Sequence, residues 1–302
     1  MHVFVTGATG LIGRALVPAL LEAGHAVTAL SRSAAPRAAP QPARLTVLQG
    51  DPTTAGPWQE TLAACDACVH LAGEPVAAGR WTEARKRRIR ESRVASTRLV
   101  ADTIARKGAA VLVSGSAVGY YGARGDEPLD ESAPPGDDFL ARVCVEWEAA
   151  AVPAATQSRV VLLRTGIVLA RGGGALAQML LPFRFFAGGP IGSGEFWQSW
   201  IHLADEVGLI VWALGSSEVV GPLNATAPAP VRNRELAKAI GRTLHRPSAI
   251  PVPRAALKLA LGELAEVVTT GQRAVPKKAL DLGYRFRFPD LEPALADVLA
   301  RR

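Results

Sequence analysis

Three glycines spaced three residues apart stand near the start of the chain, in the run VFVTGATGLIG over residues 3–13. A strand-like stretch over 3–6 precedes them, and a helix-like segment over 11–23 follows. Glycines in such a turn let backbone N–H groups approach a pyrophosphate, and the helix N-terminus adds partial positive charge. The run therefore predicts a dinucleotide-binding turn. The residues expected to form it are Thr6, Gly7, Thr9, Gly10, Leu11, Ile12 and Gly13.

The end of the second expected strand, over 26–30, indicates which dinucleotide binds. A protein that selects NAD usually carries Asp or Glu there, to bind the ribose 2′-hydroxyl. Ser31 and Arg32 stand there instead, with Arg37 nearby, and a guanidinium binds a 2′-phosphate in a fork geometry. We therefore predict NADP(H) as the cofactor. Asp51, after the third strand, could hold the adenine amino group, and an ordinary turn aspartate is the other interpretation.

Strand-like and helix-like segments alternate through the first half of the chain, which predicts an α/β fold. We expect a Rossmann-like, doubly wound parallel sheet with a smaller C-terminal substrate lobe. The expected strands lie over 3–6, 26–30, 45–48, 68–71, 111–114 and 160–163, and the main helices over 11–23, 82–107, 138–151 and 175–186. We place an NADP-binding domain at 1–165, with a return contribution near 200–230, and a mainly helical substrate lobe at 166–302.

Composition and charge limit the classes of partner. Hydrophobic residues make up 49% of the 302 residues, yet no apolar run reaches the ~18 residues of a membrane span. The chain begins in a strand without a basic leader, so we expect a cytoplasmic protein and no membrane partner. The net charge is +7, concentrated in RWTEARKRRIRESR over 80–93. No nucleic-acid recognition motif accompanies it, so we expect no nucleic-acid partner.

Two smaller patterns leave alternatives open. Lys86 and Arg93, in the basic segment, could meet an anionic ligand, and a solvated helix face is the simpler interpretation. Cys65 and Cys68 have C-x-x-C spacing, which is found in zinc and redox sites. A zinc site would need a second pair of ligands, and the remaining Cys144 and five scattered histidines supply none. We therefore expect buried thiols and no metal.

Motifs along nearly the whole chain resemble one known family. They include VTGATGLIGRAL at 5–16, HLAGEP at 70–75, SGSAVGYYG at 114–122, RTGIVL at 164–169, WIHLAD at 200–205 and GPLNATAP at 221–228. Together they resemble the extended short-chain dehydrogenase/reductase superfamily. Within it, they are most similar to atypical NAD-dependent epimerase/dehydratase family proteins with a C-terminal domain of unknown function. The block over 251–289 resembles that C-terminal domain.

The resemblance implies roles for two stretches that follow strands. The segment after His70 would pass beneath the ribose and nicotinamide of the cofactor. Ser116 falls where the superfamily keeps a catalytic Ser or Thr, whose hydroxyl binds a substrate oxygen. Apart from any family, Ser-Gly-Ser at the carboxyl end of a parallel strand lies where such sheets bind ligands, and a turn hydroxyl is the alternative. The cofactor contacts implied by the resemblance are Leu71, Ala72, Gly73 and Glu74.

The superfamily's Tyr-x-x-x-Lys signature, in which lysine lowers the tyrosine pKa, is missing. None of the three tyrosines is followed by lysine four residues later, and Leu140 and Cys144 stand in the expected helix. A tyrosine elsewhere, with Arg124 nearby to favour the phenolate, could serve as the acid/base. A carboxyl group could do so instead, although a helix-surface position is the other interpretation of Glu148. The candidates are Tyr120, Tyr121 and Glu148, with Glu131 and Asp205 as further carboxyl groups.

Two functions follow from these observations. The first is an NADP(H)-binding oxidoreductase or epimerase that acts on a small-molecule substrate, of which a sugar-like metabolite is one candidate. The second is a non-catalytic NADP(H)-binding sensor or partner-binding protein, which the missing dyad favours. Homo-oligomers are common in the superfamily, so a homo-oligomer is considered for this chain as well.

Overall fold

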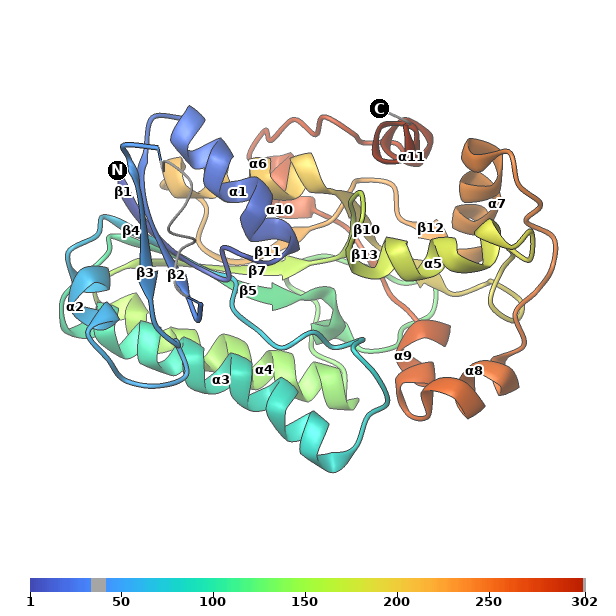
Figure 1. Cartoon of the computed structure of the whole chain (residues 1–302), viewed down its shortest axis with the longest axis horizontal. Coiled ribbons are helices and arrows are strands. Elements are labelled where there is room, and N and C mark those ends of the chain that lie inside the picture. Colours follow the sequence, from blue (N-terminus) through green and yellow to red (C-terminus); the bar gives the residue numbers. More distant parts are fainter. Residues whose placement is uncertain (34–41, 301–302) are drawn as a thin grey trace.

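Seven strands form one parallel sheet at the centre of the computed structural model, which describes residues 1–33 and 42–300 (Figure 1). Arg37 lies outside the described residues. The order across the sheet is β3-β2-β1-β4-β5-β7-β11, and every pair of neighbours is parallel. This arrangement confirms the predicted Rossmann-like fold class. The strands are β1 (His2–Thr6), β2 (Ala26–Ser31), β3 (Leu45–Gln49), β4 (Ala67–His70), β5 (Val111–Ala117), β7 (Arg159–Thr165) and β11 (Gly221–Ala225).

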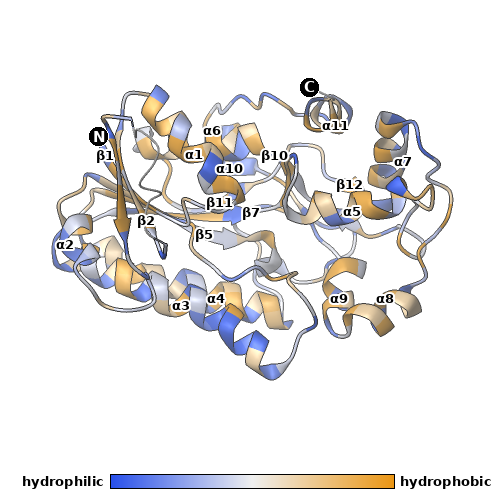
Figure 2. Ribbon diagram, in the orientation of Figure 1, coloured by the Kyte–Doolittle hydropathy of each residue, from blue (hydrophilic) through white to orange (hydrophobic). Residues whose placement is uncertain are grey.

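Helices cover both faces of this sheet. Helices α1 (Leu11–Glu22) and α6 (Leu203–Gly215) pack on one face, and α2 (Trp58–Ala63), α3 (Glu83–Arg106) and α4 (Phe139–Ala151) on the other (Figure 1). Side chains along β1 point alternately to the two faces of the sheet, so Val3 and Val5 pack in the core on one face and Phe4 packs in the core on the other. Figure 2 shows that the first turns of α3 are hydrophilic.

Local signals fix where two of the longer helices start. The Thr82 hydroxyl accepts a hydrogen bond from the backbone N–H of Arg85, which caps α3. Asp138 caps α4 in the same way through the N–H of Ala141. Helix α1 differs, since it begins after Gly10 without any side-chain cap among the described residues.

The second half of the chain builds a smaller cluster beside the sheet. Its core joins α5 (Gly174–Arg184), α7 (Asn233–Leu244) and α11 (Leu291–Leu299) through buried side chains such as Leu176, Trp200 and Leu295. The remaining helices are α8 (Arg254–Leu261), α9 (Leu264–Thr269) and α10 (Lys277–Asp281). Short strands complete it. One comes from the first half of the chain, β6 (Pro128–Leu129), which pairs with β13 (Arg273–Ala274). The others are β8 (Ile167–Leu169), β9 (Trp197–Gln198), β10 (Trp200–His202) and β12 (Val231–Arg232).

Two carboxylates at the start of α6 are buried. Asp205 accepts hydrogen bonds from the backbone N–H groups of Arg287 and Phe288, at 2.7 and 2.8 Å, and so ties the C-terminal segment to α6. Glu206 has only the hydroxyl of Thr165, 2.8 Å from its Oε1, while its Oε2 has no partner among the described residues. Burial therefore raises the pKa of Glu206 to about 8. No helix in the described part of the chain is both long and apolar enough to cross a membrane.

We expect Glu206→Gln to stabilise the protein most at alkaline pH. Because its pKa is about 8 in the folded state against 4.5 ordinarily, the unfolded chain ionises first as pH rises, and the free energy of unfolding falls across that window. Glutamine has no proton to lose. The difference in free energy of unfolding between the variant and the wild type should therefore grow by about 3 kcal/mol, in favour of the variant, from pH 5 to pH 8. Urea unfolding at both pH values measures the gain, with exposed Glu91→Gln as control; parallel pH profiles would contradict it.

Candidate active site

The strand order reverses between β1 and β4, because β2 and β3 lie on one side of β1 and the later strands on the other. Ligands of open parallel sheets bind at this switch point, beyond the carboxyl ends of the strands. The segments that follow β1 and β4 are the glycine-rich turn and residues 71–74. The fold therefore brings together two of the stretches from which cofactor contacts were predicted.

Packing explains two of the three glycines. Gly7 has φ +70°, and a Cβ built on it would lie 2.7 Å from the carbonyl carbon and oxygen of Leu71. A Cβ on Gly13 would collide with the backbone of Gly7 and Ala8. Gly10 is different, since a Cβ built on it would meet, among the described residues, just the carbonyl oxygen of Gly7, at 3.2 Å. Gly7 and Gly13 therefore hold the turn against β4 and α1, while Gly10 borders open space.

The N-terminus of α1 at this turn fits a pyrophosphate. No described side chain caps it, and its first turn contains no acidic residue. The first N–H groups of a helix have no acceptor within the helix, so Leu11 and Ile12 keep donors for a ligand. The loop after β8 lies against the same turn, because a Cβ on Gly173 or Gly174 would come within 3 Å of the Leu11 side chain, at 2.8 and 2.9 Å.

The end of β2 and the residue after it leave a guanidinium exposed beside the turn. Ser31 is half-buried and Arg32 is exposed, and Arg32 forms no ion pair with any described residue. Asp51 accepts hydrogen bonds from the backbone N–H and the hydroxyl of Thr53, at 2.8 and 2.7 Å. Burial works against ionisation of Asp51, but the Thr53 hydrogen bonds and the charge of Arg32 lower its pKa overall. Asp51 therefore stabilises its own turn, as the simpler interpretation predicted, and its contact with adenine stays a prediction.

Thr6 lies beneath the site and is fully buried. Its hydroxyl is 2.7 Å from Nδ1 of His70 and accepts a hydrogen bond from the N–H of Ala72. His70 Nε2 lies 3.0 Å from the hydroxyl of Ser96, and burial lowers the pKa of His70 to about 4, so the imidazole is neutral. These bonds hold Leu71–Gly73 in place, so the Thr6 side chain contributes by positioning the crevice floor. Glu74, beyond it, pairs with Arg85 at 3.4 Å.

The predicted catalytic residues meet in a buried polar network. The Ser116 hydroxyl donates to Oε1 of Glu148 at 2.7 Å. Arg164 binds both carboxylate oxygens of Glu148, at 2.8 and 2.9 Å, and donates to the Tyr121 hydroxyl at 3.0 Å. The Tyr121 hydroxyl in turn donates to Oδ1 of Asn224 at 2.7 Å. All five residues are buried, so these groups bond chiefly to one another.

Two expectations about this network are wrong. Glu148 is not a surface residue of its helix, because its side chain is 9% exposed and paired with Arg164. Arg124 does not reach the tyrosine hydroxyls; it donates to backbone carbonyl oxygens, including that of Tyr121, and Arg164 takes the place beside both rings. Sequence reasoning did not single out Arg164 or Asn224. A charged residue in the apolar strand RVVLLRT is the signal that could have indicated a buried partner for Arg164.

Tyr120 differs from Tyr121 in its burial and in the hydrogen bonds of its hydroxyl. It is half-buried, the Arg164 guanidinium carbon lies 3.5 Å from its ring centroid, and its hydroxyl forms no hydrogen bond with the described residues. Of the other carboxyl candidates, Glu131 accepts from the backbone N–H groups of Asn224 and Lys278, and Asp205 holds the C-terminal segment. Ser116 and Tyr120 are therefore the predicted catalytic residues that retain capacity to meet a substrate.

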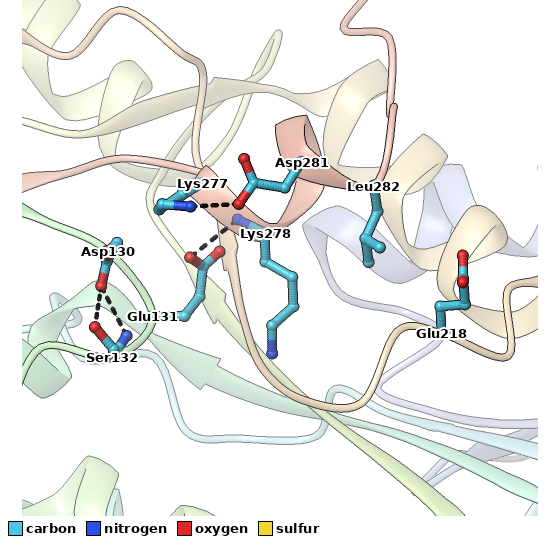
Figure 3. Close-up of a pocket in the computed structure, with 8 residues that line it drawn as sticks. All are labelled: Asp130, Glu131, Ser132, Glu218, Lys277, Lys278, Asp281 and Leu282. Carbon is cyan, nitrogen blue, oxygen red and sulfur yellow. Dashed lines mark hydrogen bonds and ion pairs between the residues drawn. The ribbon is translucent and has the colours of Figure 1, made fainter.

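A separate hollow of about 600 Å³ lies by β11 and α10 (Figure 3). Both of its lysines are already bonded, since Lys277 pairs with Asp281 and Lys278 donates to the carbonyl oxygens of Val220 and Pro222. It borders Glu218, just before the amino end of β11, so it stands away from the carboxyl edge of the sheet. The described residues hold no cluster of three or more His, Cys, Asp or Glu suited to a metal ion, and all three thiols are buried.

Comparison with known proteins finds similarity over nearly the whole chain. A family model, NAD dependent epimerase/dehydratase family, matches residues 3–225, and a domain of unknown function matches 252–298. An Arabidopsis thaliana epimerase family protein, described as a chloroplastic homologue of SDR39U1, is 43% identical over 99% of this chain and 87% of its own length. Human SDR39U1, crystallised with NADPH, is 37% identical, with a TM-score of 0.87 over 99% of both chains. A Corynebacterium glutamicum protein described as a nucleoside-diphosphate sugar epimerase is 35% identical, with a TM-score of 0.79 over 99% of this chain and 58% of that one.

The buried ion pair yields a test of the network. Arg164→Met or Glu148→Leu alone leaves its partner charged and buried, and we expect each to cost about 3–5 kcal/mol of unfolding free energy. The double variant removes both charges and should cost clearly less than the sum of the two. Ser116→Ala, which removes one hydrogen bond, should cost roughly 1 kcal/mol. Urea denaturation measures all four, and additive losses in the double variant would show that the two charges do not act as a pair.

Proposed function

This chain belongs to the NAD-dependent epimerase/dehydratase family, and on that premise we propose that it is an NADP(H)-dependent oxidoreductase or epimerase acting on a small, sugar-like metabolite. The observation that carries the proposal is the uncapped α1 N-terminus beside the exposed guanidinium of Arg32, with no carboxylate at the end of β2. The human relative was crystallised with NADPH. The description of the Corynebacterium relative as a sugar epimerase supports the substrate class.

Each part of the cofactor has residues suited to it. The N–H groups of Leu11 and Ile12 would hold the pyrophosphate, and Ser31 and Arg32 the 2′-phosphate. The backbone over 71–74 would line the ribose, where Gly73 permits a close approach. When bound, NADP(H) accepts or supplies a hydride. We place the cofactor in the domain over 1–165, with its return contribution near 200–230, and the substrate against the lobe over 166–302.

Ser116 and Tyr120 are the side chains we propose to contact substrate. Because the Ser116 hydroxyl hydrogen points to Glu148, its oxygen can accept a hydrogen bond from a substrate hydroxyl. The Tyr120 hydroxyl can donate to or accept from the same substrate, with the positive charge of Arg164 against its ring. Glu148 and Tyr121 are then positioning residues, since both carboxylate oxygens and the phenol are bonded within the network.

The alternative is an NADP(H)-binding sensor or partner-binding protein without turnover. The commitment of Glu148 and Tyr121 to the ion-pair network, together with the missing Tyr-x-x-x-Lys dyad, favours it. Nucleotide binding would then change the affinity for a partner or the oligomeric state instead of supporting chemistry. A cytoplasmic location and a homo-oligomer remain predictions for either function.

Calorimetric titration of cofactor-free protein with NADPH and NADH tests the cofactor. We expect NADPH to bind more tightly, and Arg32→Ala to weaken it about 10- to 100-fold, because a hydrogen bond to a charged group contributes roughly 1.5–3 kcal/mol. NADH lacks the 2′-phosphate, so its affinity should stay unchanged. Arg98→Ala, an exposed residue of α3, is the control. Failure of the wild type to bind either nucleotide would refute the proposal.

A change in the redox state of the bound cofactor, supplied as NADP⁺ or as NADPH, with a panel of sugars, ketones and quinones separates enzyme from sensor. If turnover occurs, Ser116→Ala and Tyr120→Phe should each lower kcat by at least about tenfold while NADPH affinity stays within about twofold, since neither hydroxyl is assigned to the cofactor. No change in the redox state of either cofactor form with any member of the panel, together with an NADPH-dependent change in oligomeric state, would favour the sensor.

A further inference from the structure

Two neighbouring phenylalanines at the end of α5 are the only exposed aromatic side chains among the described residues. Phe185 is 79% exposed and Phe186 is 53% exposed. Leu181, one turn earlier on the same side of α5, is also exposed. Ile250, exposed as well, lies beside them, because its backbone N–H bonds to the carbonyl oxygen of Gly188 at 3.3 Å. We call Leu181, Phe185, Phe186 and Ile250 the apolar tip.

The fold does not account for the exposed ring of Phe186. Phe183, in the same turn, packs in the core of the lobe. Phe186 has φ +59°, a left-handed conformation that favours glycine and strains an aromatic residue. Its N–H and that of Ala187 bond to the carbonyl oxygens of Phe183 and Pro182, the pattern with which helices commonly end on glycine. Glycine would therefore suit the backbone better, so the side chain itself calls for a function.

The segments that build this end of the lobe carry positive charge alone. Residues 167–194 and 236–262 contain seven lysines and arginines and no aspartate or glutamate. The Arg246 guanidinium stacks on the Phe186 ring, with Cζ 4.1 Å from the ring centroid. Arg184 is exposed, and neither arginine forms an ion pair with a described residue. Exposed apolar side chains beside unpaired cations complement a surface that is anionic outside and apolar beneath.

A lipid bilayer fits the apolar tip better than a second copy of the chain does. Two copies that met through this face would bring like charges together, which is unfavourable. Figure 1 places α5 and α7 at one end of the long axis, away from β2 and β3, so a flat surface can reach them. Aromatic rings and long basic side chains are also the groups that favour the boundary between lipid headgroups and acyl chains.

The basic run at the start of α3 lacks this combination. Residues 80–93 include no large hydrophobic side chain that is exposed. Lys86 pairs with Glu83 and Glu263. Arg88 is exposed and forms no ion pair with a described residue, so it provides a comparison for a cation of the tip.

We propose that the apolar tip docks on an anionic lipid bilayer, with Phe185 and Phe186 inserted among the headgroups and Arg184 and Arg246 beside lipid phosphates. Our expectation of no membrane partner rested on the lack of a spanning run in the sequence, and a peripheral contact needs none. The tip belongs to the smaller lobe, apart from the glycine-rich turn. The proposal therefore goes beyond the proposed function and does not depend on it.

Co-sedimentation of the full chain with lipid vesicles tests the contact. Vesicles made of equal parts phosphatidylcholine and phosphatidylglycerol should bind the protein more tightly than phosphatidylcholine alone, and added salt should weaken the binding. Phe185→Ser and Phe186→Gly should each weaken it at least about tenfold, because each removes the apolar area of one ring from the bilayer. Val152→Ser, an exposed apolar residue just after α4, is the control and should change nothing.

Two variants separate the contact from folding and from general charge. Glycine relieves the backbone strain at Phe186, so Phe186→Gly should be at least as stable in urea as the wild type while it binds vesicles less. Arg184→Gln should weaken binding to the anionic vesicles roughly fivefold, since one cation near the surface is lost. Arg88→Gln removes the same charge from α3 and should leave the binding unchanged.

The competing occupants give different results. No binding of the wild type to the anionic vesicles, or binding that both phenylalanine variants leave unchanged, would overturn the proposal. Self-association in sedimentation velocity that Phe186→Gly abolishes, without vesicle binding, would assign the tip to a second copy of the chain. Binding of an acidic amphipathic peptide by protein that does not bind the vesicles would assign it to a protein partner.

Discussion

The close contact between the turn after β1 and the backbone after β4 is the constraint on which the site depends. Gly7 approaches the Leu71 carbonyl so closely that no side chain fits between them. The contact fixes the height of the α1 N-terminus above the sheet edge. It also fixes residues 71–74, which Thr6 and His70 support from below. The phosphate-binding and ribose-lining segments are therefore set by one backbone contact instead of by flexible side chains.

A second constraint is electrostatic. Arg164 and Glu148 are both buried, and such a pair is stable only when its remaining polar atoms are satisfied. Ser116, Tyr121 and the Glu131 carbonyl oxygen satisfy them. These hydrogen bonds and the ion pair join β5, α4 and β7 in one network, which reaches β11 through Asn224. The hydroxyl of Ser116 thereby has a fixed direction, although it stands on a strand end where a serine could rotate freely.

The sequence predicted the parts that depend on local pattern. Glycine spacing identified the turn, and alternating strand and helix segments identified the parallel sheet. What it did not reveal depends on which face of a helix meets which strand. The face of α4 that bears Glu148 was nonetheless readable, since Ala141, Cys144 and Glu148 recur at helical spacing and are all buried. The partner Arg164 could not be assigned, because 15 residues separate the two along the chain and only the sheet order places them together. The position of Arg93 near the Trp147 ring depends in the same way on the packing of α3 against α4.

The late position of β11 in the chain has a consequence for how the molecule is made. This strand completes the sheet, yet it is synthesised only after the first part of the smaller lobe. Until residue 225 has left the ribosome, β7 is an open edge and the Tyr121 hydroxyl lacks Asn224. The nucleotide-binding half therefore cannot reach its final structure first and wait for the rest. Its sheet is completed only when more than two-thirds of the chain has emerged, so the two halves mature together.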